Sequence, residues 1–157
     1  MKIARITLSD RASAGIYEDR SGPEIERILG EQVDEVIEWK RVLIPDELPR
    51  IEEALREMCD AEQCDLVVTT GGTGPAPRDV TPEATRAVLD RELPGFGEII
   101  RGQSFAKVPT AILSRATAGT RGRTLIINLP GNPRAIGECL PLLIPAICEA
   151  TRHLRGE

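Results

Sequence analysis

Segments of strand character alternate with segments of helical periodicity along all 157 residues. Residues 65–70 and 124–128 are short, aliphatic and β-branched, which is typical of strands buried on both faces of a sheet. Residues 3–9 and part of 33–44 have the same character. Because helices separate these strands, we predict an α/β fold: a three-layer sandwich around a central, mostly parallel, Rossmann-like sheet.

Helices are predicted between the strands from capping signals and apolar spacing. Ser21 precedes Glu24 by three residues, which is the spacing of a capping box with Ser21 as the N-cap. Thr81 and Pro82 form a second helix start, because proline is favoured in the first helical turn. Residues 95–114 are predicted to be helical in pieces, broken at proline 109.

The last predicted helix carries a long apolar stripe that two prolines interrupt. Apolar residues recur at helical spacing over 136–148. Pro141 and Pro145 each remove a hydrogen-bond donor and clash with the preceding turn. We therefore expect a break at Leu140–Pro141 and two consecutive helices.

Composition indicates one folded domain over residues 1–157, with 41% hydrophobic and 29% charged residues. No apolar run approaches the roughly 20 residues needed to span a bilayer, and no targeting segment is expected, so we expect a cytoplasmic protein without membrane contact. The net charge of −5 argues against nucleic-acid binding by general charge attraction. An anionic ligand would need a local site.

The cysteines and the single histidine exclude several kinds of site. No CxxC motif occurs among the four cysteines, and His153 stands near the end of the chain, so a zinc site is not expected. Cys139 and Cys148 fall on the apolar stripe, which favours buried, reduced core thiols. No histidine lies near a candidate loop, so Ser-His and Cys-His nucleophiles are excluded.

Three loops follow strands directly and consist of polar residues and glycine. They cover residues 9–13, 70–75 and 129–133. In an open parallel sheet, ligands bind outside the carboxyl ends of the strands. The three loops are therefore predicted to form one site.

The glycine-rich loop has two open interpretations. Residues 71–74 would let backbone N–H groups approach a phosphate, or they form a plain tight turn. The loop matches neither the Walker A motif nor the dinucleotide fingerprint. Residues 131–133 also have two interpretations, because they place a helix N-terminus directly after a strand. This N-terminus binds an anion, or it is an ordinary helix start with Asn132 as the N-cap and proline at the first position.

Two acids stand apart from the surface charges. Asp46 lies at a strand-to-helix turn, and Asp79 follows the glycine-rich loop. Carboxylates near bound phosphates commonly hold Mg²⁺, a cation that prefers oxygen ligands. Taken alone, the residues favour ordinary structural roles: a helix cap for Asp46 and a solvated turn acid for Asp79.

Six motifs together resemble the molybdopterin adenylyltransferases of molybdenum cofactor synthesis and the related gephyrin G domain. The resemblance covers nearly the whole chain, and the order of the motifs makes it specific. The motifs are Ser-Asp-Arg-Ala-Ser at 9–13, Thr-Thr-Gly-Gly-Thr-Gly-Pro at 69–75, Arg-Asp-Val-Thr-Pro-Glu-Ala at 78–84, Leu-Pro-Gly-Phe-Gly-Glu at 93–98, Leu-Ser-Arg at 113–115 and Leu-Pro-Gly-Asn-Pro at 129–133.

The resemblance implies transfer of adenylyl from ATP to molybdopterin, with Mg²⁺, by a homotrimer. It assigns catalysis and the metal to Asp46 and Asp79, both regarded as essential in the family. It places ATP phosphates on Gly71 to Gly74, and pterin or nucleotide at Ser114 and the loop before Asn132. The full set of expected binding residues is Ser9, Asp10, Thr70, Gly71, Gly72, Thr73, Gly74, Ser114, Pro130, Gly131 and Asn132.

Two other functions remain open at this point. One is a molybdopterin-binding or scaffold protein without turnover, and the other is a nucleotide pyrophosphatase with the same fold. The expected partners are the small molecules ATP and molybdopterin, together with a molybdate-inserting enzyme that would receive the product.

Overall fold

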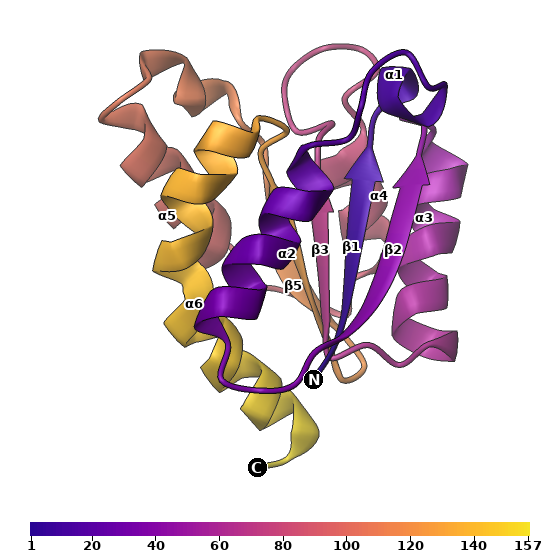
Figure 1. Cartoon of the computed structure of the whole chain (residues 1–157), viewed down its shortest axis with the longest axis vertical. Coiled ribbons are helices and arrows are strands. Elements are labelled where there is room, and N and C mark those ends of the chain that lie inside the picture. The colour runs from indigo at the N-terminus through magenta and orange to yellow at the C-terminus, as the bar shows by residue number, and fades with distance from the viewer.

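The computed structural model describes residues 1–157 and contains one six-stranded sheet in the order β2-β1-β3-β6-β5-β4 (Figure 1). Strands β1, β2, β3 and β6 are parallel, and β5 runs antiparallel to both β6 and β4. The mostly parallel sheet is therefore confirmed. The strands are β1 (Lys2–Leu8), β2 (Glu38–Ile44), β3 (Leu66–Thr70), β4 (Arg91–Glu92), β5 (Ala118–Arg121) and β6 (Thr124–Leu129).

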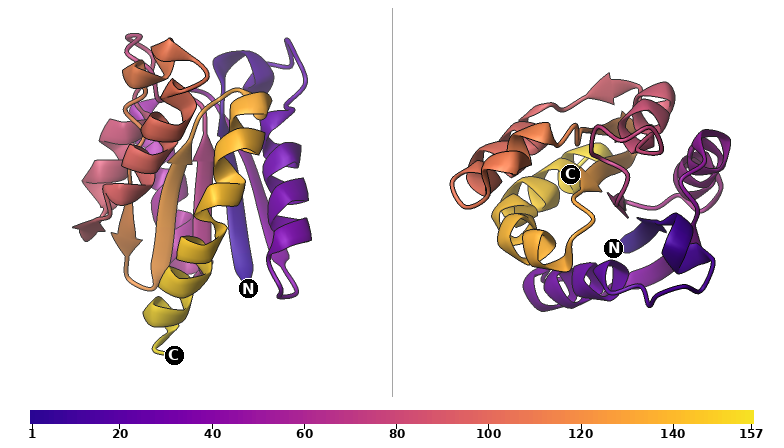
Figure 2. Two further views of the ribbon diagram at one scale, coloured as in Figure 1. Left: turned by 90° about the vertical axis from the view of Figure 1, so that its left-hand side faces the viewer. Right: turned by 90° about the horizontal axis from the view of Figure 1, so that it is seen from above.

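Helices cover both faces of the sheet, which confirms the three-layer prediction (Figure 2). None of them is both long enough and apolar enough to cross a membrane. One face carries α2 (Ser21–Gln32), α5 (Gly95–Phe105) and α6 (Pro133–Arg155), and the other carries α3 (Leu48–Arg56), the π-helix η1 (Glu57–Ala61) and α4 (Thr81–Val88). The short helices α1 (Asp10–Ser13) and η2 (Pro109–Leu113) lie in connections.

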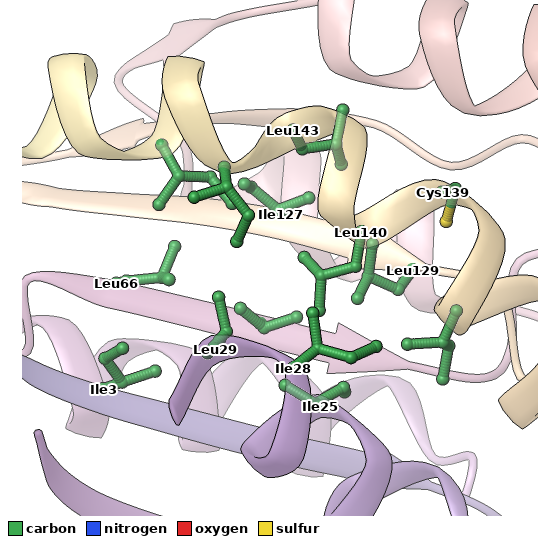
Figure 3. Close-up of a cluster of buried hydrophobic side chains, with 14 of the residues drawn as sticks. Ile3, Ile25, Ile28, Leu29, Leu66, Ile127, Leu129, Cys139, Leu140 and Leu143 are labelled. Carbon is green, nitrogen blue, oxygen red and sulfur yellow. The ribbon is translucent and has the colours of Figure 1, made fainter. Parts of the chain in front are cut away.

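Alternate residues of the strands supply two aliphatic cores. On β1, Ile3 faces α2 and α6, whereas Ile6 faces α3 and α4. The first core contains 18 buried residues and the second 14. Figure 3 shows the first core, in which isoleucine and leucine side chains from the sheet meet those of α2 and α6. Aliphatic packing on both faces holds the parallel strands in register, and so holds their carboxyl ends in line.

Helix α6 is continuous from Pro133 to Arg155, so the predicted break at Leu140–Pro141 is wrong. Both Pro141 and Pro145 lie inside the helix. Buried residues lie on either side of the two prolines, including Ile136 and Ile147, and they pack on the same core. This shared packing outweighs the two ladder hydrogen bonds that the prolines remove.

The capping prediction at Ser21 is also wrong. Ser21 is the first residue of α2, and its hydroxyl donates to the carbonyl oxygen of Gly131 at 2.6 Å. The Asp19 carboxylate instead accepts from the Gly22 N–H at 3.0 Å. A charged acceptor is the stronger partner for this free N–H. The Ser21 hydroxyl therefore bonds to the loop before α6 and connects that loop to α2.

Burial predicts which thiols react with an alkylating reagent in the native protein. Burial raises the pKa of Cys59 and of Cys139 to about 12, and that of Cys64 to about 11, whereas Cys148 is partly exposed. At pH 8 we expect iodoacetamide to modify Cys148 first and the other three only in urea, because the thiolate is the reactive form. Mass spectrometry of peptides checks this; equal labelling of Cys59 in the native state would contradict it.

Candidate active site

A cleft of about 620 Å³ lies at the carboxyl ends of β1, β3 and β6. The loops that follow these strands all contribute to it, as the parallel topology predicted. Eight of the predicted site residues line this cleft: Ser9, Asp46, Thr70, Gly71, Gly72, Asp79, Gly131 and Asn132.

Asp46 follows β2 and presents an unpaired carboxylate oxygen. Its Oδ2 accepts from the Asp10 N–H at 3.1 Å, whereas its Oδ1 is buried and has no hydrogen-bond partner. Burial raises the pKa of Asp46, and the negative charges of Asp10 and Asp79 raise it further. A buried carboxylate oxygen without a partner is costly, so a cation at this position would satisfy it.

Asp79 closes a turn at the edge of the cleft. Its Oδ2 accepts from the Ala76 N–H at 3.1 Å, and its own N–H donates to the Ala76 carbonyl oxygen at 2.9 Å. Gly74 packs directly beside this carboxylate, and a Cβ there would come within 2.8 Å of Asp79 Oδ2. The glycine thus leaves room for the acid.

Asp46 and Asp79 fit a Mg²⁺ site that is completed by water and substrate, and they do not fit a metal site coordinated only by protein side chains. No group of three or more His, Cys, Asp or Glu side chains is arranged to hold a metal ion. Mg²⁺ typically takes one or two carboxylates and completes its coordination with water and substrate phosphates. Two acids beside an open cleft, one with an unpaired oxygen, match that pattern.

The glycine-rich loop bends at two glycines with positive φ, a conformation that is compatible with both of its interpretations. Gly71 has φ of +96° and Gly72 has φ of +66°, a region that side chains rarely adopt. A Cβ on Gly71 would also overlap the Leu8 carbonyl oxygen. The Thr81 hydroxyl donates to the Gly71 carbonyl oxygen at 2.9 Å and thereby joins the loop to α4.

Arg115 holds the glycine-rich loop from outside the cleft and was not among the predicted site residues. Its Nε donates to the Gly74 carbonyl oxygen at 2.9 Å, and its Nη2 donates to the Asp79 carbonyl oxygen at 2.7 Å. Its backbone N–H donates to the Thr73 carbonyl oxygen at 2.8 Å. The side chain also pairs with Glu83 at 2.6 Å. The motif at 113–115 was the signal that pointed to this residue.

The segment between α1 and α2 adds further lining residues that sequence reasoning missed. The Asp19 carboxylate accepts from the Thr7 hydroxyl at 2.8 Å and pairs with Arg5 at 3.0 Å. The hydroxyls of Tyr17 and Ser9 lie 2.8 Å apart. Arg20 is the only basic residue that lines the cleft, and it forms no ion pair. It is therefore free to meet an anion.

Five predicted binding residues lie outside the cleft. Asp10 binds Arg78 and the Asp46 N–H, Thr73 is a buried residue of the glycine-rich loop, and Gly74 packs on Asp79. The remaining two, Ser114 and Pro130, line a neighbouring cavity of about 240 Å³, which shares Asn132 with the cleft.

Asn132 begins α6 as an ordinary N-cap, as one interpretation predicted. Its Oδ1 accepts from the Arg134 N–H at 2.9 Å, and Pro133 occupies the first helical position. Because Asn132 also lines both the cleft and the neighbouring cavity, the start of a 23-residue helix faces the site.

Comparison with known proteins places the chain in a family. A family model described as a probable molybdopterin binding domain matches residues 4–149. A molybdopterin adenylyltransferase of Helicobacter pylori (strain J99) is 55% identical over 145 residues, covering 92% of this chain and 82% of the relative. That of Escherichia coli (strain K12) is 51% identical over 140 residues, covering 89% and 72%.

Solved structures agree with the sequence comparison. The molybdopterin biosynthesis enzyme MoaB from Thermus thermophilus superposes with a TM-score of 0.89 at 43% identity, covering 99% of this chain and 97% of that chain. A molybdopterin biosynthesis protein from Mycobacterium abscessus gives a TM-score of 0.90 at 36% identity, covering 99% and 96%. The chain therefore belongs to the molybdopterin-binding domain family, alongside the bacterial molybdopterin adenylyltransferases.

Proposed function

We propose that this protein transfers an adenylyl group from ATP to the terminal phosphate of molybdopterin. An oxygen of the pterin phosphate attacks the α-phosphorus of ATP, the bond from that phosphorus to the bridging oxygen breaks, and pyrophosphate leaves. One observation carries the proposal: a chain more than half identical to molybdopterin adenylyltransferases brings Asp46 and Asp79 together beside a glycine-rich turn.

The substrate supplies the nucleophile, so the protein needs only to position the phosphates and offset their charge. No histidine or cysteine lines the cleft, which is consistent with such a reaction. Asp46 and Asp79 would hold Mg²⁺, and bound Mg²⁺ supplies positive charge that offsets the negative charge of the phosphates. The buried, unpaired Oδ1 of Asp46 is the observation that supports this assignment.

Separate parts of the site would hold the two substrates. Of the glycine-rich loop, Gly71 and Gly72 line the cleft and would bind the ATP phosphates together with the Ser9 hydroxyl, and Arg20 adds the one free cation of the cleft. The smaller cavity at Ser114 and Pro130 would take part of the pterin. Because this cavity meets the cleft at Asn132, the two substrates would face each other there.

The direct test measures pyrophosphate release with ATP, Mg²⁺ and molybdopterin, omitting each component in turn. The proposal expects release that requires all three, together with formation of adenylylated molybdopterin. Release without the pterin would identify a nucleotide pyrophosphatase instead. Binding of the pterin without any release would identify a scaffold protein.

The same proposal includes a homotrimer, supported by an exposed apolar groove between α5 and α6. Its lining is mostly hydrophobic, and both Ile99 (46% exposed) and Leu142 (52% exposed) lie open to solvent in it. Contiguous exposed apolar surface commonly marks an interface between proteins. The groove is lined by Leu93, Pro94, Gly95, Phe96, Ile99, Leu142, Leu143 and Ala146.

We expect the wild-type protein to sediment at about three times its chain mass of 17.1 kDa. The Ile99→Glu, Leu142→Glu double variant should sediment as a monomer, because burying two carboxylates in an apolar interface is unfavourable. Val36→Glu is the control, since Val36 is 92% exposed and lies outside the groove. A wild-type monomer, or a double variant that stays trimeric, would contradict this assignment.

A cytoplasmic location and transfer of the product to a molybdate-inserting enzyme complete the proposal. Adenylylated molybdopterin is an activated intermediate, so a second protein must consume it. Adding that enzyme and molybdate should deplete the adenylylated product in the same assay, which would connect the two steps.

A further inference from the structure

We propose that Asp10 and Arg78 form a clasp that orients Asp46 and joins it to the turn carrying Asp79. Both are then positioning residues for the metal, and neither contacts substrate. This inference rests on the proposed function, in which Asp46 and Asp79 hold Mg²⁺. It also gives Asp10 a different role from the binding role expected from the sequence.

The first half of the clasp is a reciprocal pair of hydrogen bonds between Asp10 and Asp46. The Asp10 N–H donates to Asp46 Oδ2 at 3.1 Å, and the Asp46 N–H donates to Asp10 Oδ1 at 3.0 Å. Each carboxylate therefore holds the backbone of the other residue. Because Oδ2 of Asp46 is used in this way, the rotation of the carboxylate is set and its Oδ1 is left unpaired.

The second half of the clasp is a two-point contact from Arg78. Its Nε donates to Asp10 Oδ2 at 3.0 Å, and its Nη2 donates to Asp10 Oδ1 at 2.7 Å. Such a fork fixes direction as well as distance. Arg78 belongs to the turn that Asp79 closes with Ala76, so the contact connects the loops that carry the two acids.

Charge explains why an arginine is needed at this position. The negative charges of Asp10 and Asp79 add to the effect of burial in raising the pKa of Asp46, whereas the charge of Arg78 lowers it. Arg78 is the cation paired with this group, through Asp10. It offsets the repulsion without occupying the unpaired oxygen of Asp46.

Stability does not account for the clasp. The side chains of Arg78 and Asp10 are 61% and 42% exposed, and exposed ion pairs contribute little to folding. If the Arg78–Asp10 ion pair served only folding, its removal would have the same effect as the removal of another exposed ion pair of the chain. Arg86 and Glu92 form such a pair at 3.2 Å with similar exposure, outside the cleft.

The test measures Mn²⁺ binding by electron paramagnetic resonance with α,β-methylene-ATP, which the protein cannot cleave. We expect Arg78→Met to weaken Mn²⁺ binding roughly 10-fold to 100-fold, as is common for residues that orient metal ligands. Arg78→Lys should show most of this loss, because lysine keeps the charge but not the fork. Arg86→Met, the matched control, should bind Mn²⁺ like the wild type.

Asp10 variants separate the two halves of the clasp. Asp10→Asn keeps an oxygen for the Asp46 N–H and should lose less Mn²⁺ affinity than Asp10→Ala. Combining Asp10→Ala with Arg78→Met should cost no more than Asp10→Ala alone, because the two residues act as one unit. Thermal unfolding by circular dichroism should leave Arg78→Met and Arg86→Met within a few degrees of the wild type.

Several outcomes would overturn the clasp. Normal Mn²⁺ binding by Arg78→Met, or an equal loss in Arg86→Met, would do so. A raised KM for ATP with unchanged Mn²⁺ affinity would instead make Arg78 a phosphate ligand. A wild-type protein that binds no Mn²⁺ would leave nothing to position and would also reject the clasp. Failure of the proposed function alone differs: the wild type and variants would show the expected Mn²⁺ differences, but no adenylylated molybdopterin would form.

Discussion

The Asp79→Asn variant is expected to release pyrophosphate at least about 100-fold more slowly than the wild type, the loss typical when a charge-stabilising group is removed from an active site. Asparagine has the shape of aspartate and keeps an oxygen that accepts from the Ala76 N–H, so the turn at 76–79 should persist. What disappears is the negative charge that the proposed Mg²⁺ site requires. The loss should therefore appear in the rate of the reaction, with the fold unchanged.

A matched control is available in the same chain. Asp90 also uses one carboxylate oxygen to accept a backbone N–H, that of Gly122 at 2.7 Å, and it does not line the cleft. Asp90→Asn should release pyrophosphate at the wild-type rate. Circular dichroism establishes that both variants are folded, and turnover of Asp79→Asn within a few-fold of the wild type would reject the role assigned to Asp79.

The layers of the fold were predictable because burial leaves a local pattern in the sequence. Strands β3 and β6 are buried along their whole length, and each appears in the sequence as a short run centred on aliphatic residues. Strand β4 has only two residues, both exposed, so it carries no such pattern and was missed. The continuous α6 was missed for another reason: its two prolines are a local signal, whereas the packing that outweighs them involves α2 and the sheet.

The position of the site was predictable, but the residues that hold it together were not. Parallel strands end at one edge, so the loops at 9–13, 70–75 and 129–133 had to lie close to one another. Arg78 and Arg115 belong to motifs at 78–84 and 113–115, but nothing local indicates their partners Asp10 and Gly74, which lie 68 and 41 residues away. Long-range contacts of this kind depend on the assembled fold.

The Gly71→Ala variant is expected to lose both stability and activity. Gly71 has φ of +96°, and an added Cβ would overlap the Leu8 carbonyl oxygen. The backbone conformation alone should lower the free energy of unfolding by about 1–3 kcal/mol, and the displaced end of β1 adds to that cost. Because Ser9 and Asp10 follow Leu8 directly, the shift should also disturb Asp46 and slow pyrophosphate release.

Gly30→Ala is the control, because the same substitution is expected to stabilise the protein at this position. The comparison separates the effect of the loop geometry at Gly71 from the effect of replacing glycine by alanine. Gly30 lies within α2, and a Cβ there would meet no atom within 4 Å. Alanine should raise the free energy of unfolding by about 0.5–1 kcal/mol, because it is the better helix former. Urea unfolding measures both variants. A Gly71→Ala protein as stable as the wild type would mean that the loop can adopt a second conformation. The positive φ of Gly71 would then not be required to place Leu8 and the two acids around one cleft.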